Sequence, residues 1–280
     1  MAWCLDFHAP YRCRHAGACC RAGWTIPFED GTIAARDAGG ACSFLDGTAQ
    51  RCSIHHARGV HALPVTCRMF PRVVLHDDRG TFLSLSHFCP TAARLLFDAR
   101  GEATIVEAPP PLADIGDLDG LDARGLWPPL LRPRLLMDLD SYGLWERRAV
   151  SILTRDTIDP REALAELEDI TARITSWVPG ANALQDVVRS AFDGHTACAP
   201  AGASDATTGA VKRWLAARLF GSWTAYQGDG LAATLACLRS CLDTFTREAD
   251  ADGDVLEAIR RSDLRILHTV APVPGERLPR

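Results

Sequence analysis

The second half of the chain carries apolar side chains at helical spacing, which predicts about six helices packed as a bundle. The clearest helix begins at Asp159, a capping residue that is followed by Pro160 and then by Glu162. Its apolar face is formed by Leu164, Leu167, Ile170, Ile174 and Trp177. A second face is formed by Leu231, Leu235, Leu238, Leu242 and Phe245. Further helices are expected over 134–153, from Asn182, over 209–220 and over 254–269, with a loop at 196–209.

One β-hairpin is predicted in the first third of the chain. Two β-rich runs, 73–76 and 81–85, flank the turn sequence Asp77-Asp78-Arg79-Gly80. Antiparallel pairing about this turn sets His76 opposite Thr81. Cys67 and Cys89 would then approach each other at the open end of the hairpin, where two thiols are well placed to clamp one metal ion.

The composition changes near residue 100, from cysteines, histidines and turn residues to Ala, Leu, Asp and Arg. The prolines and the Asp/Gly-rich run within 107–129 predict an irregular connector, because proline cannot continue a helix. We therefore expect an α+β fold that is mainly α. It would comprise a small cysteine-rich, metal-chelating module with a short β-hairpin (1–106), the connector (107–129) and a helical domain (130–280).

Cysteines are concentrated at one end of the chain, where eight of the eleven lie in the first 89 residues. The N-terminus has no basic region and no apolar run of the kind that marks a secretory signal. No apolar stretch approaches the roughly 18 residues that a membrane helix needs. These features predict a cytoplasmic protein with reduced thiols, and clustered thiols in that compartment indicate metal binding. The alternative is an exported protein held together by disulfides.

The candidate metal ligands are Cys13, Cys19, Cys20, Cys42, Cys52, Cys67 and Cys89. Soft thiolates select zinc, Cu(I) or iron–sulfur centres. A structural zinc ion or a cubane iron–sulfur cluster takes about four ligands, so seven thiols exceed either need. The surplus leaves three arrangements open: two metal sites, one polynuclear site, or four ligands with spare thiols. Histidines that lie near these cysteines could complete a ligand set, and they are His15, His55, His56 and His87.

The formal net charge of −5 argues against a general nucleic-acid-binding protein. Five arginines nevertheless lie within a few residues of cysteines, namely Arg12, Arg14, Arg21, Arg68 and Arg72. Their guanidinium groups would favour the deprotonated thiol. They also fit the arginine-rich composition of the chain, in which Lys212 is the single lysine.

Four cysteine-containing motifs follow one another along the first third of the chain. They are the double cysteine Cys19-Cys20, Cys42-Ser-Phe-Leu, Cys52-Ser-Ile-His and Cys67-Arg-Met-Phe-Pro. With these motifs, residues 7–95 resemble the CxxCxxCC putative zinc- or iron-chelating domain family, which includes flagellin lysine N-methylases. The resemblance implies that the seven candidate cysteines correspond to family cysteines. Where the family motif has its second cysteine, this chain has Ala16. One ligand is therefore missing, or His15 or Cys4 replaces it.

These observations favour a cytosolic cysteine-cluster protein that chelates zinc or iron, with an iron–sulfur cluster as one form of the centre. The alternative is a metal-dependent enzyme related to flagellin lysine N-methylases, or a redox enzyme, with the cluster near its active site. No phosphate-binding loop or catalytic motif is present. The sequence therefore assigns neither catalytic nor cofactor-binding residues. The expected partner is a protein or a small molecule, with no nucleic acid and no membrane.

Overall fold

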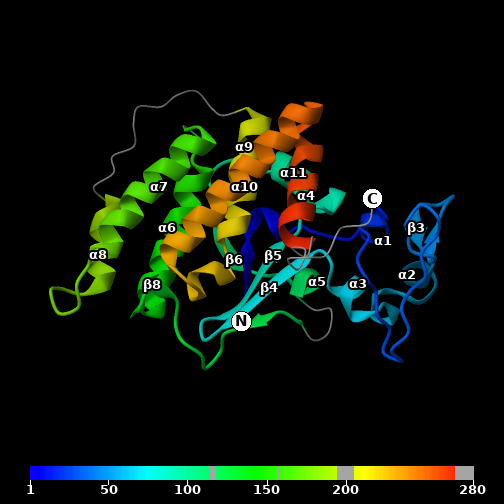
Figure 1. The fold of residues 1–280 in the computed structure, drawn as a ribbon, viewed down its shortest axis with the longest axis horizontal. Helices are drawn as coiled ribbons and strands as arrows, with labels where there is room; N and C mark the ends of the chain where they lie inside the picture. Colours follow the sequence, from blue (N-terminus) through cyan, green and yellow to red (C-terminus); the bar gives the residue numbers. More distant parts are fainter. Residues whose placement is uncertain (114–117, 157, 194–204, 269–280) are drawn as a thin grey trace, which may run out of the picture.

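A computed structural model describes residues 1–113, 118–156, 158–193 and 205–268. It shows a mixed α+β fold that is mainly helical, as predicted (Figure 1). The cysteine-rich segment lies at one end of the molecule, and helix α8 lies at the opposite end (Figure 1). No helix within the described ranges is both long and apolar enough to cross a membrane.

A five-stranded sheet joins the cysteine-rich segment to the helices. Its strand order is β6-β1-β5-β4-β7. The strands are β1 (Ala2–Leu5), β4 (Arg72–Asp77), β5 (Gly80–Leu85), β6 (Ile105–Glu107) and β7 (Leu121–Asp122). Strands β4 and β5 form the predicted hairpin, and His76 pairs with Thr81, as the sequence predicted. The neighbouring strands β1 and β6 were not predicted, because runs this short carry little periodic signal.

The two faces of the sheet pack into different apolar clusters. Leu5, Leu75 and Phe82 face the helices, whereas Leu83 and Val74 belong to a second cluster on the other face. This alternation follows from the period of two along a strand. The second cluster is completed by residues of α3 (Val65–Met69), α4 (Pro90–Asp98) and α5 (Pro110–Ala113).

The six predicted helices are present. They are α6 (Leu139–Thr154), α7 (Pro160–Thr175), α8 (Leu184–Asp193), α9 (Ala206–Leu219), α10 (Leu231–Asp252) and α11 (Val255–Asp263), the last continuing into η4 (Leu264–His268). Trp145 of α6 and Trp214 of α9 are fully buried at the centre of this core.

The predicted start of the first helix at residue 134 is wrong. Residues 130–136 form a hairpin of β8 (Leu130–Arg132) and β9 (Leu135–Leu136), in which Arg134 adopts a φ of 65°. The helix starts later because Asp138 caps it by accepting a hydrogen bond from the backbone of Ser141.

Two other predicted segments differ from the structure in part. The predicted loop at 196–209 lies outside the described residues as far as 204, and its last residues form the start of α9. The segment 107–129, predicted as an irregular connector, contains α5 and β7. The division of the chain into three domains remains a prediction.

Replacing Asp159 with alanine is expected to lower the free energy of unfolding by about 1 kcal/mol. Asp159 accepts a hydrogen bond at the start of α7, and Glu162 completes the capping box. Urea denaturation followed by circular dichroism would measure the change. Asp169→Ala is the matched control, because Asp169 is an exposed residue within the same helix. Equal effects of the two substitutions would contradict a capping role.

The turn of the β4–β5 hairpin is fixed to helix α6 by a partly buried arginine. Arg79 forms ion pairs with Asp77 at 2.7 Å and with Glu146 at 2.9 Å. Its guanidinium group also lies over the rings of Phe82, 4.3 Å from the centroid, and Tyr142, 4.7 Å from the centroid. The hairpin is therefore held rigidly against the helical core, and so are the residues that follow β5.

Candidate metal centre

Short elements and turns build the cysteine-rich segment. They comprise α1 (Ala18–Arg21), β2 (Leu45–Asp46), β3 (Arg51–Cys52), α2 (Ser53–Arg58), η2 (Val60–Ala62) and α3. The double cysteine lies on α1, which begins directly after Gly17. Gly17 has a φ of +68°, and a Cβ atom there would lie 2.8 Å from the carbonyl oxygen of Gln50. Glycine is therefore required for this close approach of the two backbones.

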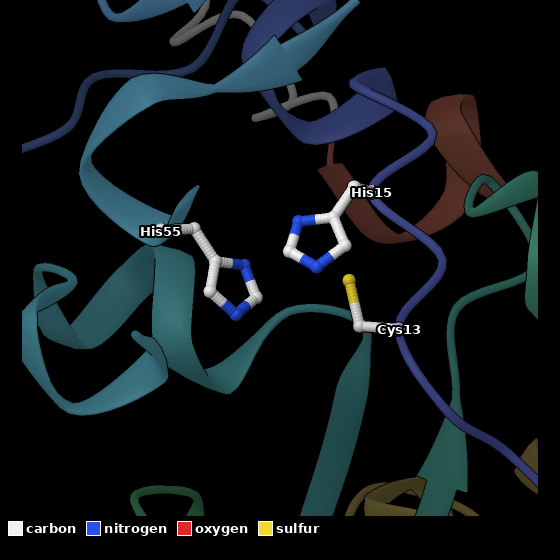
Figure 2. A group of neighbouring side chains, drawn as sticks. All are labelled: Cys13, His15 and His55. Atoms are coloured by element: carbon white, nitrogen blue, oxygen red, sulfur yellow. The ribbon is translucent and has the colours of Figure 1, made fainter. Parts of the chain in front are cut away.

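One group of donors combines a thiol with two imidazoles. Cys13, His15 and His55 each offer a ligand atom, and these atoms all lie within 4.8 Å of one another. Figure 2 shows the three side chains converging, with Cys13 and His15 on the stretch before α1 and His55 on α2. Among the described residues, this is the one group of three such donors at this spacing. We call it the mixed set.

The surroundings of His55 favour the neutral form of histidine that metal ligation requires. Burial and the neighbouring His15 lower the pKa of His55. The two rings lie 4.2 Å apart between centroids. A lowered pKa keeps the His55 imidazole neutral at pH 7, and only the neutral ring has a lone pair to offer a metal.

A second group consists of thiols alone. It contains Cys20, Cys42, Cys52 and Cys67, and we call these four residues the thiol set. Cys19, the neighbour of Cys20 in the sequence, lies beside this set. All five belong to or pack against one small apolar cluster with Ile26. Burial and the neighbouring thiols raise the pKa of Cys67 to about 12. A hydrogen bond with Cys19, together with burial, raises the pKa of Cys20 to about 12.

Because the pKa values of these thiols lie well above 7, zinc affinity is expected to increase steeply with pH. At pH 7 the thiols of Cys20 and Cys67 are protonated, and a metal ion must displace those protons. Each displaced proton makes binding about tenfold tighter per pH unit while the pH stays below the pKa. We therefore expect zinc affinity to rise at least about a hundredfold between pH 6.5 and 7.5. Competition against a chromophoric chelator measures this, and an affinity that does not change with pH would exclude these thiols as ligands.

Cys89 lies close to the mixed set. It occupies the position directly before α4, and its Sγ lies 3.8 Å from the hydroxyl oxygen of Tyr11. Tyr11 in turn interacts with Cys13. Cys67 instead interacts with Cys20, Cys42 and Cys52. The structure therefore associates Cys67 and Cys89 with different donor groups, whereas the hairpin argument had placed them on a single metal ion.

The helical part of the protein holds the segment that leads to Cys89. Each of residues 84–88 makes a hydrogen bond to α9, α11 or η4. The bonds join Ser84 to Ala217 (2.9 Å), Leu85 to Arg218 (3.2 Å), Ser86 to His268 (2.8 Å), His87 to Asp263 (3.2 Å) and Phe88 to Arg260 (3.1 Å). Helices that are distant in sequence therefore fix the position of a candidate ligand.

Asp263 is the centre of these contacts and is fully buried. Its carboxylate accepts hydrogen bonds from the backbone N–H and Nδ1 of His87 and, at 2.7 Å, from Nε1 of Trp214. Burial alone would raise the pKa of Asp263, but Arg218, His87 and Trp214 outweigh burial and hold it well below its usual value. Nε2 of His87 lies 3.1 Å from Nε2 of His8, which is also fully buried. His87 is therefore part of a buried polar network.

The structure brings most of the candidate residues together at one cavity. Six of the seven predicted cysteines line one cavity of about 250 Å³: Cys13, Cys19, Cys20, Cys52, Cys67 and Cys89. Cys42 packs in the cluster beside them. His15 and His55 also line the cavity. Of the two residues considered as replacements for the family cysteine at Ala16, His15 belongs to the mixed set and lines the cavity. Cys4 is fully buried in the second apolar cluster of the sheet and does not line the cavity.

Sequence analysis did not identify Tyr11 or Asp263. Tyr11 lies two positions before Cys13, and that proximity is a signal that could have found it. Asp263 lies on a helix far along the chain, so no local pattern could have linked it to Cys89. All ten described cysteines are free thiols, so no disulfide forms among the described residues.

A comparison with protein families finds a match over the cysteine-rich segment. Residues 12–90 match the CxxCxxCC family model, a putative zinc- or iron-chelating domain. The matched CxxCxxCC segment begins immediately before Cys13 and ends immediately after Cys89, so it contains both donor groups. No curated protein and no solved structure matches the chain.

The donors of the CxxCxxCC segment fit zinc or iron. Thiolate and neutral imidazole are the ligands that both metals accept from proteins. The mixed set supplies three donors, which leaves a coordination position free on a tetrahedral ion. The thiol set contains four thiols, the number that closes a structural zinc site or holds a cubane cluster, but among the described residues no three of their sulfur atoms lie within 4.8 Å of one another.

Proposed function

We propose that this protein binds zinc or iron at two neighbouring positions, the mixed set and the thiol set. The observation that carries the proposal is the convergence of Cys13, His15 and His55 within 4.8 Å, on residues 42 positions apart at most. The thiol set adds four cysteines, of which Cys67 interacts electrostatically with the other three. Two donor groups account for the surplus of thiols over the needs of one site. Because both need reduced thiols, we place the protein in the cytoplasm.

The two positions would have different roles. Four thiolates around the thiol set would form a closed site, and closed sites contribute folding energy. The mixed set faces the cavity and leaves a coordination position for a water molecule or a ligand. This open position favours a metal-dependent enzyme as the second candidate function.

Elemental analysis of anaerobically purified full-length protein tests the proposal. The analysis would be combined with acid-labile sulfide determination and an ultraviolet–visible spectrum. Two equivalents of zinc in a colourless protein would support two mononuclear sites. Iron with sulfide and brown absorbance would assign an iron–sulfur cluster to the thiol set. Protein that contains neither metal, and binds neither when both are supplied, would contradict the proposal.

A further inference from the structure

The arginines of the cysteine-rich segment lack the acidic partners that many arginines in the rest of the described chain have. Eight arginines lie between residues 12 and 72: Arg12, Arg14, Arg21, Arg36, Arg51, Arg58, Arg68 and Arg72. Within the described ranges, none of them forms an ion pair with a carboxylate. In the helical part such pairs recur, for example Arg155 with Glu166 at 3.1 Å and Arg260 with Glu257.

Four of these arginines line the cavity beside the mixed set: Arg12, Arg14, Arg68 and Arg72. Two of them are already engaged. Arg12 donates to the carbonyl oxygen of Tyr11 at 2.7 Å, and Arg72 donates to that of Leu112 at 2.7 Å. In the part of the chain that the structure describes, the side chains of Arg14 and Arg68 make no hydrogen bond. Nε of Arg68 is shielded from solvent and still has no acceptor. A shielded cationic donor without an acceptor is costly, which indicates that an acceptor enters the cavity.

The metal sites would not neutralise these cations. Four thiolates on a divalent ion carry a net charge of −2, and one thiolate with two neutral imidazoles on a divalent ion carries +1. The four arginines therefore outnumber the negative charges of the loaded sites, with Cys19 and Cys89 as neutral thiols. No aspartate or glutamate among the described residues lines the cavity. The remaining positive charge calls for an external anion.

We propose that this cavity binds a small anionic ligand through a carboxylate or phosphate group held by Arg14 and Arg68. The anionic group would lie beside the metal of the mixed set, so the proposal rests on the proposed function. Guanidinium groups suit both oxyanions, because they donate paired hydrogen bonds to two oxygens. A volume of about 250 Å³ is below the roughly 300 Å³ at which drug-sized pockets begin. The ligand is therefore a small metabolite-sized anion.

Calorimetric titration of zinc-loaded, full-length protein tests this assignment. The probes are inorganic phosphate and malonate, which distinguish a phosphate-bearing from a carboxylate-bearing ligand. We expect at least one of them to bind. Arg14→Gln and Arg68→Gln are each expected to weaken that binding about tenfold or more, since each removes a charge-assisted hydrogen bond. Arg58→Gln is the matched control, because Arg58 is exposed on α2 and does not line the cavity.

Zinc content is measured on the same samples. A protein that binds no zinc would contradict the proposed function. A zinc-loaded protein that binds neither probe would contradict only the anion site. The role of the arginines would then be to offset the negative charge of the thiolates. Equal weakening of anion binding by Arg58→Gln and by the two cavity substitutions would also overturn the assignment. The weakening would then follow from the loss of one positive charge, wherever in the protein that charge lies.

Discussion

Asp263→Ala is expected to lower the free energy of unfolding by about 3–5 kcal/mol, the range for breaking a buried charge network. The carboxylate is fully buried and accepts hydrogen bonds from His87 and Trp214. It also lies 3.8 Å from the guanidinium of Arg218. Removing it leaves a buried cation and at least two buried donors without an acceptor. Guanidinium denaturation at pH 7 measures the loss.

The pH dependence of this loss distinguishes the charge from the volume of the side chain. The pKa of Asp263 is held below its unfolded value, so its contribution is present at neutral pH and falls away below about pH 4. The difference between the wild type and the alanine variant should therefore shrink on acidification. Asp243→Ala, at an exposed position of α10, is the control and should change stability by less than about 0.5 kcal/mol. A comparable loss in both variants would show that the Asp263 network is not the cause.

Asp263→Asn extends the test to the metal centre. Asparagine keeps the shape and an acceptor for Trp214, but its N–H groups cannot accept from His87. The 84–88 segment would then lose one of its connections to α11 without a cavity forming. Cys89 contacts Tyr11, which interacts with Cys13 of the mixed set. If the helices position Cys13 through this contact, metal affinity at the mixed set should fall about tenfold, as it does when a residue that orients a ligand is lost. Unchanged metal affinity in a folded variant would contradict that role.

His15→Ala is expected to weaken metal binding at the mixed set by at least about a hundredfold. It removes one of three direct donors, and the loss of residues that merely orient a ligand already costs about 10–100-fold. Metal stoichiometry after exhaustive dialysis should fall by one equivalent, while the metal of the thiol set is retained. Elemental analysis of dialysed protein measures both.

His56→Ala is the matched control for that substitution. His56 is the exposed neighbour of His55 and lies outside both the mixed set and the cavity. It should keep the full metal content of the wild type. Loss of metal from the His56 variant but not from the His15 variant would show that the histidine of the mixed set has been assigned wrongly.

Local features that depend on neighbouring residues were well predicted from the sequence. The capping box at Asp159 fixed the start of α7, and the spacing of leucines fixed the buried face of α10. The hairpin register followed from a four-residue turn. The prediction failed at residue 134, where Arg134 adopts a left-handed conformation that the apolar pattern does not encode.

The sequence by itself determined the helices, the hairpin and the concentration of thiols at one end, because each depends on spacing over a few residues. It could not determine which donors meet. His15 and His55 are 40 residues apart, and only the packing of α2 against the stretch before α1 brings their rings together. His87 and Cys89 are two residues apart, yet one joins Asp263 in the helical core and the other faces Tyr11. Tertiary structure decided these partners, because contacts between distant segments arise from burial and shape over the whole chain.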